Sequence, residues 1–168
     1  MRSHRRRRAG FTLVEVLIVV VILGILASTV LPQFSTSARD AKETSFVQNL
    51  QTMRRQLSIY TQQHNGNYPA QGTTDSQLFF DQMTQRTDAA GTVQSAGICG
   101  PYLLGQLPPN PFNNSRTVLV INGALAAADY DGAGAHGWAF SSTTGELRGN
   151  VSIAIKSVIE TTKSVNSF

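Results

Sequence analysis

An uninterrupted apolar run near the N-terminus constrains this chain more than any other feature. The run covers 21 residues from Phe11 to Leu31, and Glu15 is its only charged residue. At about 1.5 Å per helical residue it would span roughly 32 Å, close to the ~30 Å hydrocarbon core of a bilayer. The sequence therefore predicts a membrane-spanning helix at the start of the chain.

Four consecutive arginines, residues 5–8, precede the run. Positive residues favour the cytoplasmic side, so we expect a cytoplasmic N-terminus and an exported remainder. A secretory signal would have a shorter apolar region of about 7 to 15 residues, although Ala27-Ser28-Thr29 leaves cleavage after the run as an alternative. A plain single-pass anchor is another alternative. It leaves Glu15 unexplained, because a charged carboxylate at mid-membrane costs on the order of 2.5 to 3.5 kcal/mol.

The residues GFTLVEVLIVV, from Gly10 to Val20, resemble the class III signal of type IV pilins and type II secretion pseudopilins. The resemblance continues through residues 24–27 to Pro32. It implies a prepilin whose leader is removed by a membrane peptidase that cuts between Gly10 and Phe11. The same enzyme, acting as a methyltransferase, would then methylate the new N-terminal Phe11.

The resemblance also implies a role in subunit assembly for Glu15, the fifth residue of the chain after such a cut. In a helical filament its carboxylate can pair with the cationic N-terminus of a neighbouring subunit. A buried charge is tolerable when it is paired, and removing one partner typically costs about 3 to 5 kcal/mol. The alternative is that Glu15 reaches the membrane interface and has no partner.

The positive charge of the chain belongs to the leader. Residues 1–10 contain five of the 14 basic residues and no acid, so the remainder carries nine basic and ten acidic residues. A nucleic-acid-binding protein needs a basic stripe on its folded part. The only basic doublet beyond the leader is Arg54-Arg55, and nucleic-acid binding is therefore not predicted.

The helical pattern continues beyond the apolar run. Pro32 lies between two helical stretches and predicts a kink, because proline removes one helix hydrogen bond. Residues 32–66 form the expected amphipathic continuation, which ends near Gly66. Its apolar residues recur at steps of three and four and predict one stripe that packs onto a head domain; they are Phe46, Leu50, Met53, Leu57 and Tyr60.

The remaining residues, 67–168, predict a globular head. A short helix is expected near residues 75–86, and a proline-punctuated segment at 100–112 resembles the connection between helix and sheet in many secretion pseudopilins. Strands are expected at 117–121, 136–141 and 145–150, with 151–159 as an extension or tail. The predicted fold class is α+β, in which the long helix packs on a small antiparallel sheet, the pilin fold.

No pattern of catalytic residues is present, and the chain is not predicted to be an enzyme. His64 and His136 are isolated, and Cys99 is the only cysteine, so no intrachain disulfide can form. Asp129 and Asp131 lie beside the glycines of a turn and predict a calcium site, although the spacing is not that of an EF-hand. Two solvated aspartates in a turn are the alternative, and no cofactor is required.

These features together predict a structural subunit of a type II secretion pseudopilus, located in the bacterial inner membrane and then in a periplasmic filament. The expected partners are the prepilin peptidase, other pseudopilins, an inner-membrane platform protein and an assembly ATPase. One alternative is a type IV pilus subunit, although such pilins often carry two C-terminal cysteines that this chain lacks. An alternative of another class is an unprocessed, membrane-anchored binding module.

Overall fold

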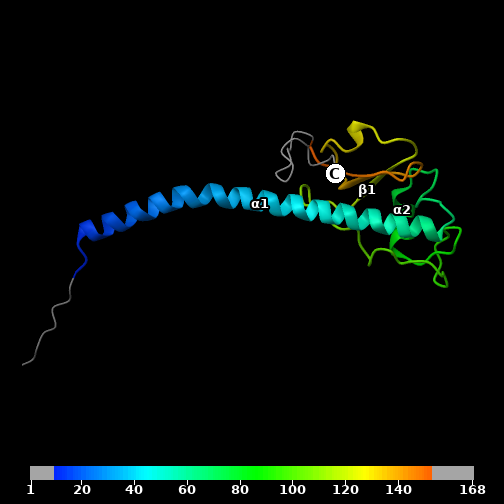
Figure 1. The fold of residues 1–168 in the computed structure, drawn as a ribbon, viewed down its shortest axis with the longest axis horizontal. Coiled ribbons are helices and arrows are strands. Elements are labelled where there is room, and N and C mark those ends of the chain that lie inside the picture. The colour runs from blue at the N-terminus through cyan, green and yellow to red at the C-terminus, as the bar shows by residue number, and fades with distance from the viewer. Residues whose placement is uncertain (1–9, 153–168) are drawn as a thin grey trace, which may run out of the picture. The chain divides into compact units, whose positions relative to one another are not determined.

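The computed structural model describes residues 10–152, and its fold is α+β as predicted (Figure 1). The predicted leader residues 1–9 and the predicted tail beyond residue 152 lie outside the described part. The chain divides into two compact units whose boundary falls within the long helix, between Arg39 and Asp40. The elements are helices α1 (Leu13–Gln63) and α2 (Ser76–Thr84), the 3-10 turn η1 (Ala127–Asp129), and strands β1 (Val118–Ile121), β2 (Trp138–Ser141) and β3 (Leu147–Gly149).

Helix α1 confirms the predicted long helix, with 51 residues. It continues through Pro32 without an interruption, and the predicted kink there stays a prediction. Its end is closed by a left-handed turn in which Asn65 and Gly66 have φ angles of 57° and 88°. The Gly66 N–H donates to the Thr61 carbonyl oxygen at 2.9 Å, a bond that satisfies one of the last carbonyls of the helix.

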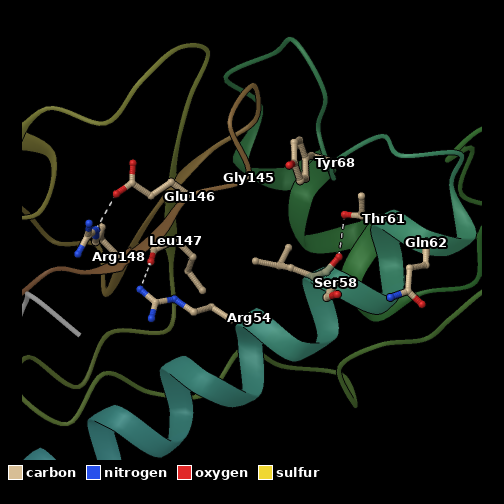
Figure 2. Close-up of a pocket in the computed structure, with 10 residues that line it drawn as sticks. Arg54, Ser58, Thr61, Gln62, Tyr68, Gly145, Glu146, Leu147 and Arg148 are labelled. Carbon is tan, nitrogen blue, oxygen red and sulfur yellow. Dashed lines mark hydrogen bonds and ion pairs between the residues drawn. The ribbon is translucent and has the colours of Figure 1, made fainter.

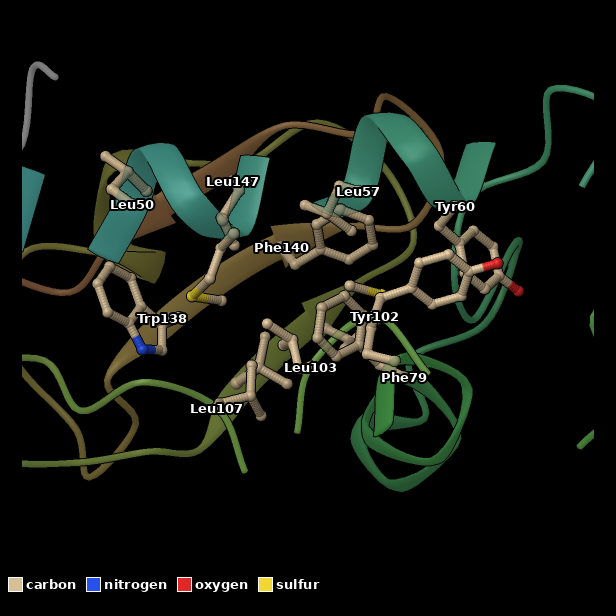
Figure 3. Close-up of a cluster of buried hydrophobic side chains, with 14 of the residues drawn as sticks. Leu50, Leu57, Tyr60, Phe79, Tyr102, Leu103, Leu107, Trp138, Phe140 and Leu147 are labelled. Carbon is tan, nitrogen blue, oxygen red and sulfur yellow. The ribbon is translucent and has the colours of Figure 1, made fainter. Parts of the chain in front are cut away.

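The predicted apolar stripe of α1 is buried in the head core (Figure 3). Glu43 and His64 extend the same stripe at steps of three and four residues, and both side chains are fully buried. The stripe packs on aromatic residues from the rest of the head. The ring of Phe46 stacks on Trp138 at 5.5 Å between centroids and meets Phe112 edge-on.

Strand β2 lies in the centre of a three-stranded sheet with the order β1-β2-β3. All four residues of β2 are buried, as expected for a strand covered on both faces. The predicted hairpin is confirmed, since β2 and β3 pair antiparallel with Trp138 opposite Gly149. Gly149 is required at this position because a Cβ atom there would collide with the ring of Phe46.

The prediction of a purely antiparallel sheet is wrong, because β1 pairs with β2 in parallel and Val118 lies opposite Trp138. The cause is the connection between them, residues 122–137, which contains η1 and returns the chain to the end at which β1 began. Parallel neighbours need a connection of about a dozen residues or more, and this one is long enough. The head sheet is therefore mixed.

The proline-punctuated segment is fastened to the sheet by Asn110. This fully buried side chain donates to the carbonyl oxygens of Gly137 and Asn150, at 2.8 and 3.0 Å, and accepts from the Phe112 N–H. The indole of Trp138 adds a bond to the Pro108 carbonyl oxygen at 2.9 Å. These buried bonds explain why an Asn-Pro-Phe element is placed where the segment reaches the strands.

Helix α2 confirms the short helix predicted near residues 75–86. Asp75 caps its N-terminus by accepting the N–H groups of Gln77 and Leu78. Phe79 reaches the central strand, with its ring 4.8 Å from that of Phe140. The helix also contacts β1, which places it at the β1 end of the sheet.

Candidate functional site

The candidate site is the first turn of α1, where the predicted cleavage position meets the apolar helix. Gly10 and Phe11 precede the helix and are exposed, with 88% of Phe11 accessible. Thr12 occupies the N-cap position and Leu13 is the first helical residue. The peptide bond between Gly10 and Phe11 therefore lies in an accessible segment that precedes the helix.

Thr12 and Glu15 form reciprocal hydrogen bonds that cap the helix. The Thr12 N–H and hydroxyl both donate to Oε2 of Glu15, at 2.8 and 2.9 Å. The Glu15 N–H in turn approaches the Thr12 hydroxyl oxygen at 3.2 Å. This is a capping box, and the Thr-x-x-Glu spacing of residues 12–15 is the sequence signal that predicts it.

The capping box satisfies one oxygen of the Glu15 carboxylate. Both bonds from Thr12 reach Oε2, and among the described residues Oε1 accepts no hydrogen bond. The negative charge also lies in the first turn of the helix, where the helix dipole favours it. Glu15 is therefore held in place by its own chain through Oε2.

Apolar side chains surround this charge on every side of the helix. Val16, Leu17 and Val20 each expose more than half of their surface, and the same holds for most of the stretch. Within residues 10–152, one helix is long and apolar enough to cross a membrane, the Leu13–Val30 stretch of α1. Such a surface is stable only when lipid or other apolar helices cover it.

The two candidate calcium ligands lie at the end of η1 and directly after it. Asp129 accepts the Ala126 N–H at 2.7 Å, and Asp131 accepts the Ala133 N–H at 2.8 Å. Calcium takes about six to eight oxygen ligands. In the part of the chain that the structure describes, no group of three or more Asp, Glu, His or Cys residues could hold a metal ion. The bonds to the backbone account for the turn, and calcium binding here stays a prediction.

His64 and Cys99 belong to a buried cluster at the end of α1. Nδ1 of His64 lies 2.7 Å from the Tyr60 carbonyl oxygen, and its Nε2 lies 2.8 Å from the hydroxyl oxygen of Thr87. Because a carbonyl oxygen only accepts, Nδ1 carries the hydrogen in the first of these contacts. Burial raises the pKa of Tyr60, and it raises the pKa of Tyr102 to about 12. This cluster fastens loops to the helix end.

A known family model matches the N-terminal part of the chain. The family model described as the prokaryotic N-terminal methylation motif matches residues 5–31, which include the predicted cleavage site and the whole apolar run. No solved structure gives a significant match to this chain.

Relatives of known identity match far beyond this motif. The type II secretion system core protein G of Aeromonas hydrophila is 34% identical over 116 residues, which cover 69% of this chain and 76% of the relative. The core protein G of Escherichia coli K12 is 31% identical over 139 residues, 82% of this chain and 88% of the relative. That of Vibrio cholerae is 41% identical over 73 residues, which are 44% of this chain and 47% of that protein. The chain therefore belongs to the family of type II secretion system core protein G, the major pseudopilins.

Proposed function

We propose that this pseudopilin is made as a precursor, cut between Gly10 and Phe11, and methylated on the new amino group of Phe11. The apolar stretch of α1 then holds it in the bacterial inner membrane, with the N-terminus in the cytoplasm and the head in the periplasm. From this reservoir, subunits are extracted into a periplasmic filament that drives protein export. The observation that carries the proposal is the single carboxylate, Glu15, fixed at the start of the otherwise apolar Leu13–Val30 stretch of α1.

Glu15 has a different partner in each of the two states. In the membrane-held subunit its charge is accommodated by Thr12 and by the helix dipole. In the filament, the second carboxylate oxygen accepts from the methylated amino group of Phe11 on a neighbouring subunit. Because an unpaired charge in an apolar environment is costly, this pairing selects the axial position at which a new subunit is stable.

The machinery implied by this cycle is that of type II secretion. A prepilin peptidase that is also the methyltransferase prepares the N-terminus, and an inner-membrane platform protein with an assembly ATPase extracts the subunit. The other subunits of the filament are pseudopilins. The role of this chain is mechanical rather than enzymatic, in keeping with relatives that are named as core proteins of a secretion system.

Replacement of Glu15 by alanine tests the assembly step. We expect Glu15→Ala to be cleaved and methylated normally, because Glu15 lies outside the proposed cleavage site between Gly10 and Phe11. We expect the variant to be absent from filaments sheared from the cells. Asp88→Asn, which removes a carboxylate charge from a loop of the head, is the matched control and should assemble. Normal incorporation of Glu15→Ala into filaments would show that the proposed pairing does not direct assembly.

The two alternative functions predict different results. A type IV pilus subunit would also need Glu15 for assembly. Cells that lack the whole subunit would then lose adhesion, motility or DNA uptake instead of secretion. An unprocessed binding module would retain residues 1–10 and would be indifferent to Glu15→Ala. The core protein G relatives favour the secretion role over both.

A further inference from the structure

A cleft of about 570 Å³ lies in the head between α1 and the β2–β3 hairpin (Figure 2). Ser58 and Thr61 of α1 line one wall, and residues 145–148 of the hairpin line the other. Tyr68 closes one end, where its ring lies against Gly145, the residue with a φ of 74° that turns the hairpin. The cleft is open to solvent and lined by both polar and apolar side chains.

The charge of this cleft is positive. Its lining contains two arginines, Arg54 and Arg148, and one acid, Glu146. Arg54 donates to the Leu147 carbonyl oxygen at 2.9 Å, and Arg148 donates to the Glu146 carboxylate at 2.7 Å. Burial, and then the neighbouring guanidinium of Arg148, lowers the pKa of Arg54. The two guanidinium groups therefore repel each other, and a further carboxylate placed between them would be stabilised by both.

Two aspartates lie on helix α2 and its cap at the other edge of the sheet, where the neighbouring cation is Arg116, which donates to the Leu107 carbonyl oxygen at 2.8 Å. Helix α2 with its cap carries Asp75 and Asp81 and no basic residue. Asp75 accepts its two capping bonds through Oδ1, and Asp81 accepts from Gln77 and Gln85 through Oδ1 as well. Among the described residues, Oδ2 of neither aspartate accepts a hydrogen bond. These oxygens are available to a donor from outside the subunit.

The strand order separates the two surfaces. The cleft is formed beside β3 and α2 contacts β1, and these strands are the opposite edges of the sheet. One subunit therefore presents a basic receptor at one edge and an acidic helix at the other. Two different, complementary surfaces on the same subunit make a head-to-tail contact, and such contacts generate helical filaments when they do not close into a ring.

We propose that the cleft of one copy of this chain receives the acidic helix α2 of the next copy along the filament. Arg54 and Arg148 bind the carboxylates of Asp75 and Asp81 in this contact. The inference rests on the proposed function, since it requires that copies of the chain assemble. It adds to that function a directional contact between heads, in addition to the contact made by the N-terminal helices.

Disulfide trapping tests the contact directly. The exposed Ser58 of the cleft and the exposed Gln77 of α2 are replaced by cysteine in one chain, and sheared filaments are oxidised. We expect a covalent ladder of several subunits, because each copy would be linked at both edges. The single variants, the parent with its buried Cys99, and Thr52→Cys combined with Gln77→Cys are the controls and should give no ladder.

Charge exchange tests the chemistry of the contact. Arg54→Glu should lower the yield of filaments about tenfold, because it places like charges opposite each other. Arg55→Glu, on the neighbouring exposed position outside the cleft lining, should leave the yield nearly unchanged. The double variant Arg54→Glu with Asp81→Arg should recover most of the yield, and thermal unfolding of each variant checks that its head is folded.

The outcomes separate this contact from the proposed function. Normal parental filaments without a ladder, or a crosslinked dimer from Ser58→Cys alone, would overturn the head-to-tail contact and leave the filament role intact. Equal losses for Arg54→Glu and Arg55→Glu would also overturn it. A parent that forms no filaments in cells with an active secretion system would instead overturn the proposed function.

Discussion

The two halves of α1 differ in what covers their apolar side chains. In the N-terminal half, Leu17 and Val20 are 57% and 60% exposed, and apolar side chains point in every direction. In the C-terminal half, Phe46 and Leu50 are 0% and 2% exposed, and the apolar side chains form one stripe. The comparison shows which surface the chain covers by itself. The head covers the apolar stripe of the second half, whereas the apolar side chains of the first half need lipid or other apolar helices to cover them.

The same difference holds for the polar groups in each half. Oε2 of Glu15 accepts from Thr12 within the first turn, and among the described residues Oε1 accepts no hydrogen bond. His64 is fully buried, and both of its ring nitrogens have partners within the head. Thus one oxygen of Glu15 in the first half has no hydrogen-bond donor among the described residues, whereas both ring nitrogens of His64 in the second half have partners in the head.

Replacement of Gly10 by leucine is expected to have the largest effect of the single substitutions considered. The peptidase must accommodate the residue before the cut, and a bulky side chain there should leave the leader attached and abolish filaments. The precursor would run larger than the parent on an immunoblot of membranes. Normal processing of Gly10→Leu would remove the proposed cleavage site, and Ala9→Leu serves as a control for bulk one residue away.

Truncation in the two halves should separate their roles in folding. Phe46→Ala removes a ring that stacks on Trp138, and we expect it to lower the free energy of unfolding of the head by about 3 to 5 kcal/mol. Val20→Ala should leave head unfolding unchanged in the detergent-solubilised protein. Both are measured by thermal unfolding followed by near-UV circular dichroism. Equal destabilisation by the two variants would show that the halves are not distinct.

A smaller effect is expected from loss of the bond between Thr87 and His64. Thr87→Val leaves Nε2 of the buried imidazole without its hydrogen-bond partner, and this should cost about 1 to 3 kcal/mol in chemical denaturation. Thr52→Val, at an exposed position of α1, controls for the change of side chain and should have almost no effect. If the two variants had the same stability, the buried bond would contribute nothing to it.

The smallest effect expected is a dependence of head stability on alkaline pH. The pKa of Tyr102 is raised to about 12 in the folded head, so the unfolded chain releases this proton first as the pH rises. Stability should therefore fall between about pH 10 and pH 12, and Tyr60 acts in the same direction. Tyr102→Phe should flatten the decline in the urea midpoint over this range. An unchanged slope in Tyr102→Phe would assign the decline to other groups.

Much of the fold was predictable because its signals are local. The length of the apolar run, the three-four spacing of the stripe and the turn between residues 142 and 145 each depend on neighbours in sequence. The parallel pairing of β1 was missed because it depends on how a long connection folds, which no local pattern specifies. The hydrogen bonds of Asn110 to the sheet were not predicted for a similar reason, since their acceptors lie 27 and 40 residues away in the sequence.

The candidate site was predictable in its residues but not in its bonds. Gly10, Phe11 and Glu15 follow from the motif, whereas the pairing of Glu15 with Thr12 appears in the structure. The cleft that contains Arg54 could not be predicted, because the sequence showed this residue only as half of a basic doublet. Arg148, which lines the opposite wall of the cleft, is distant in sequence and is brought close by the hairpin.

The intact mass of the protein, measured in parallel from the membrane and from sheared filaments, tests the central claim most directly. We expect both fractions to contain a chain that begins at Phe11 and carries one added methyl group. Filaments built from chains that retain residues 1–10 would contradict the account of a processed pseudopilin. So would a membrane fraction that contains only the full-length chain, with no protein in the filament fraction.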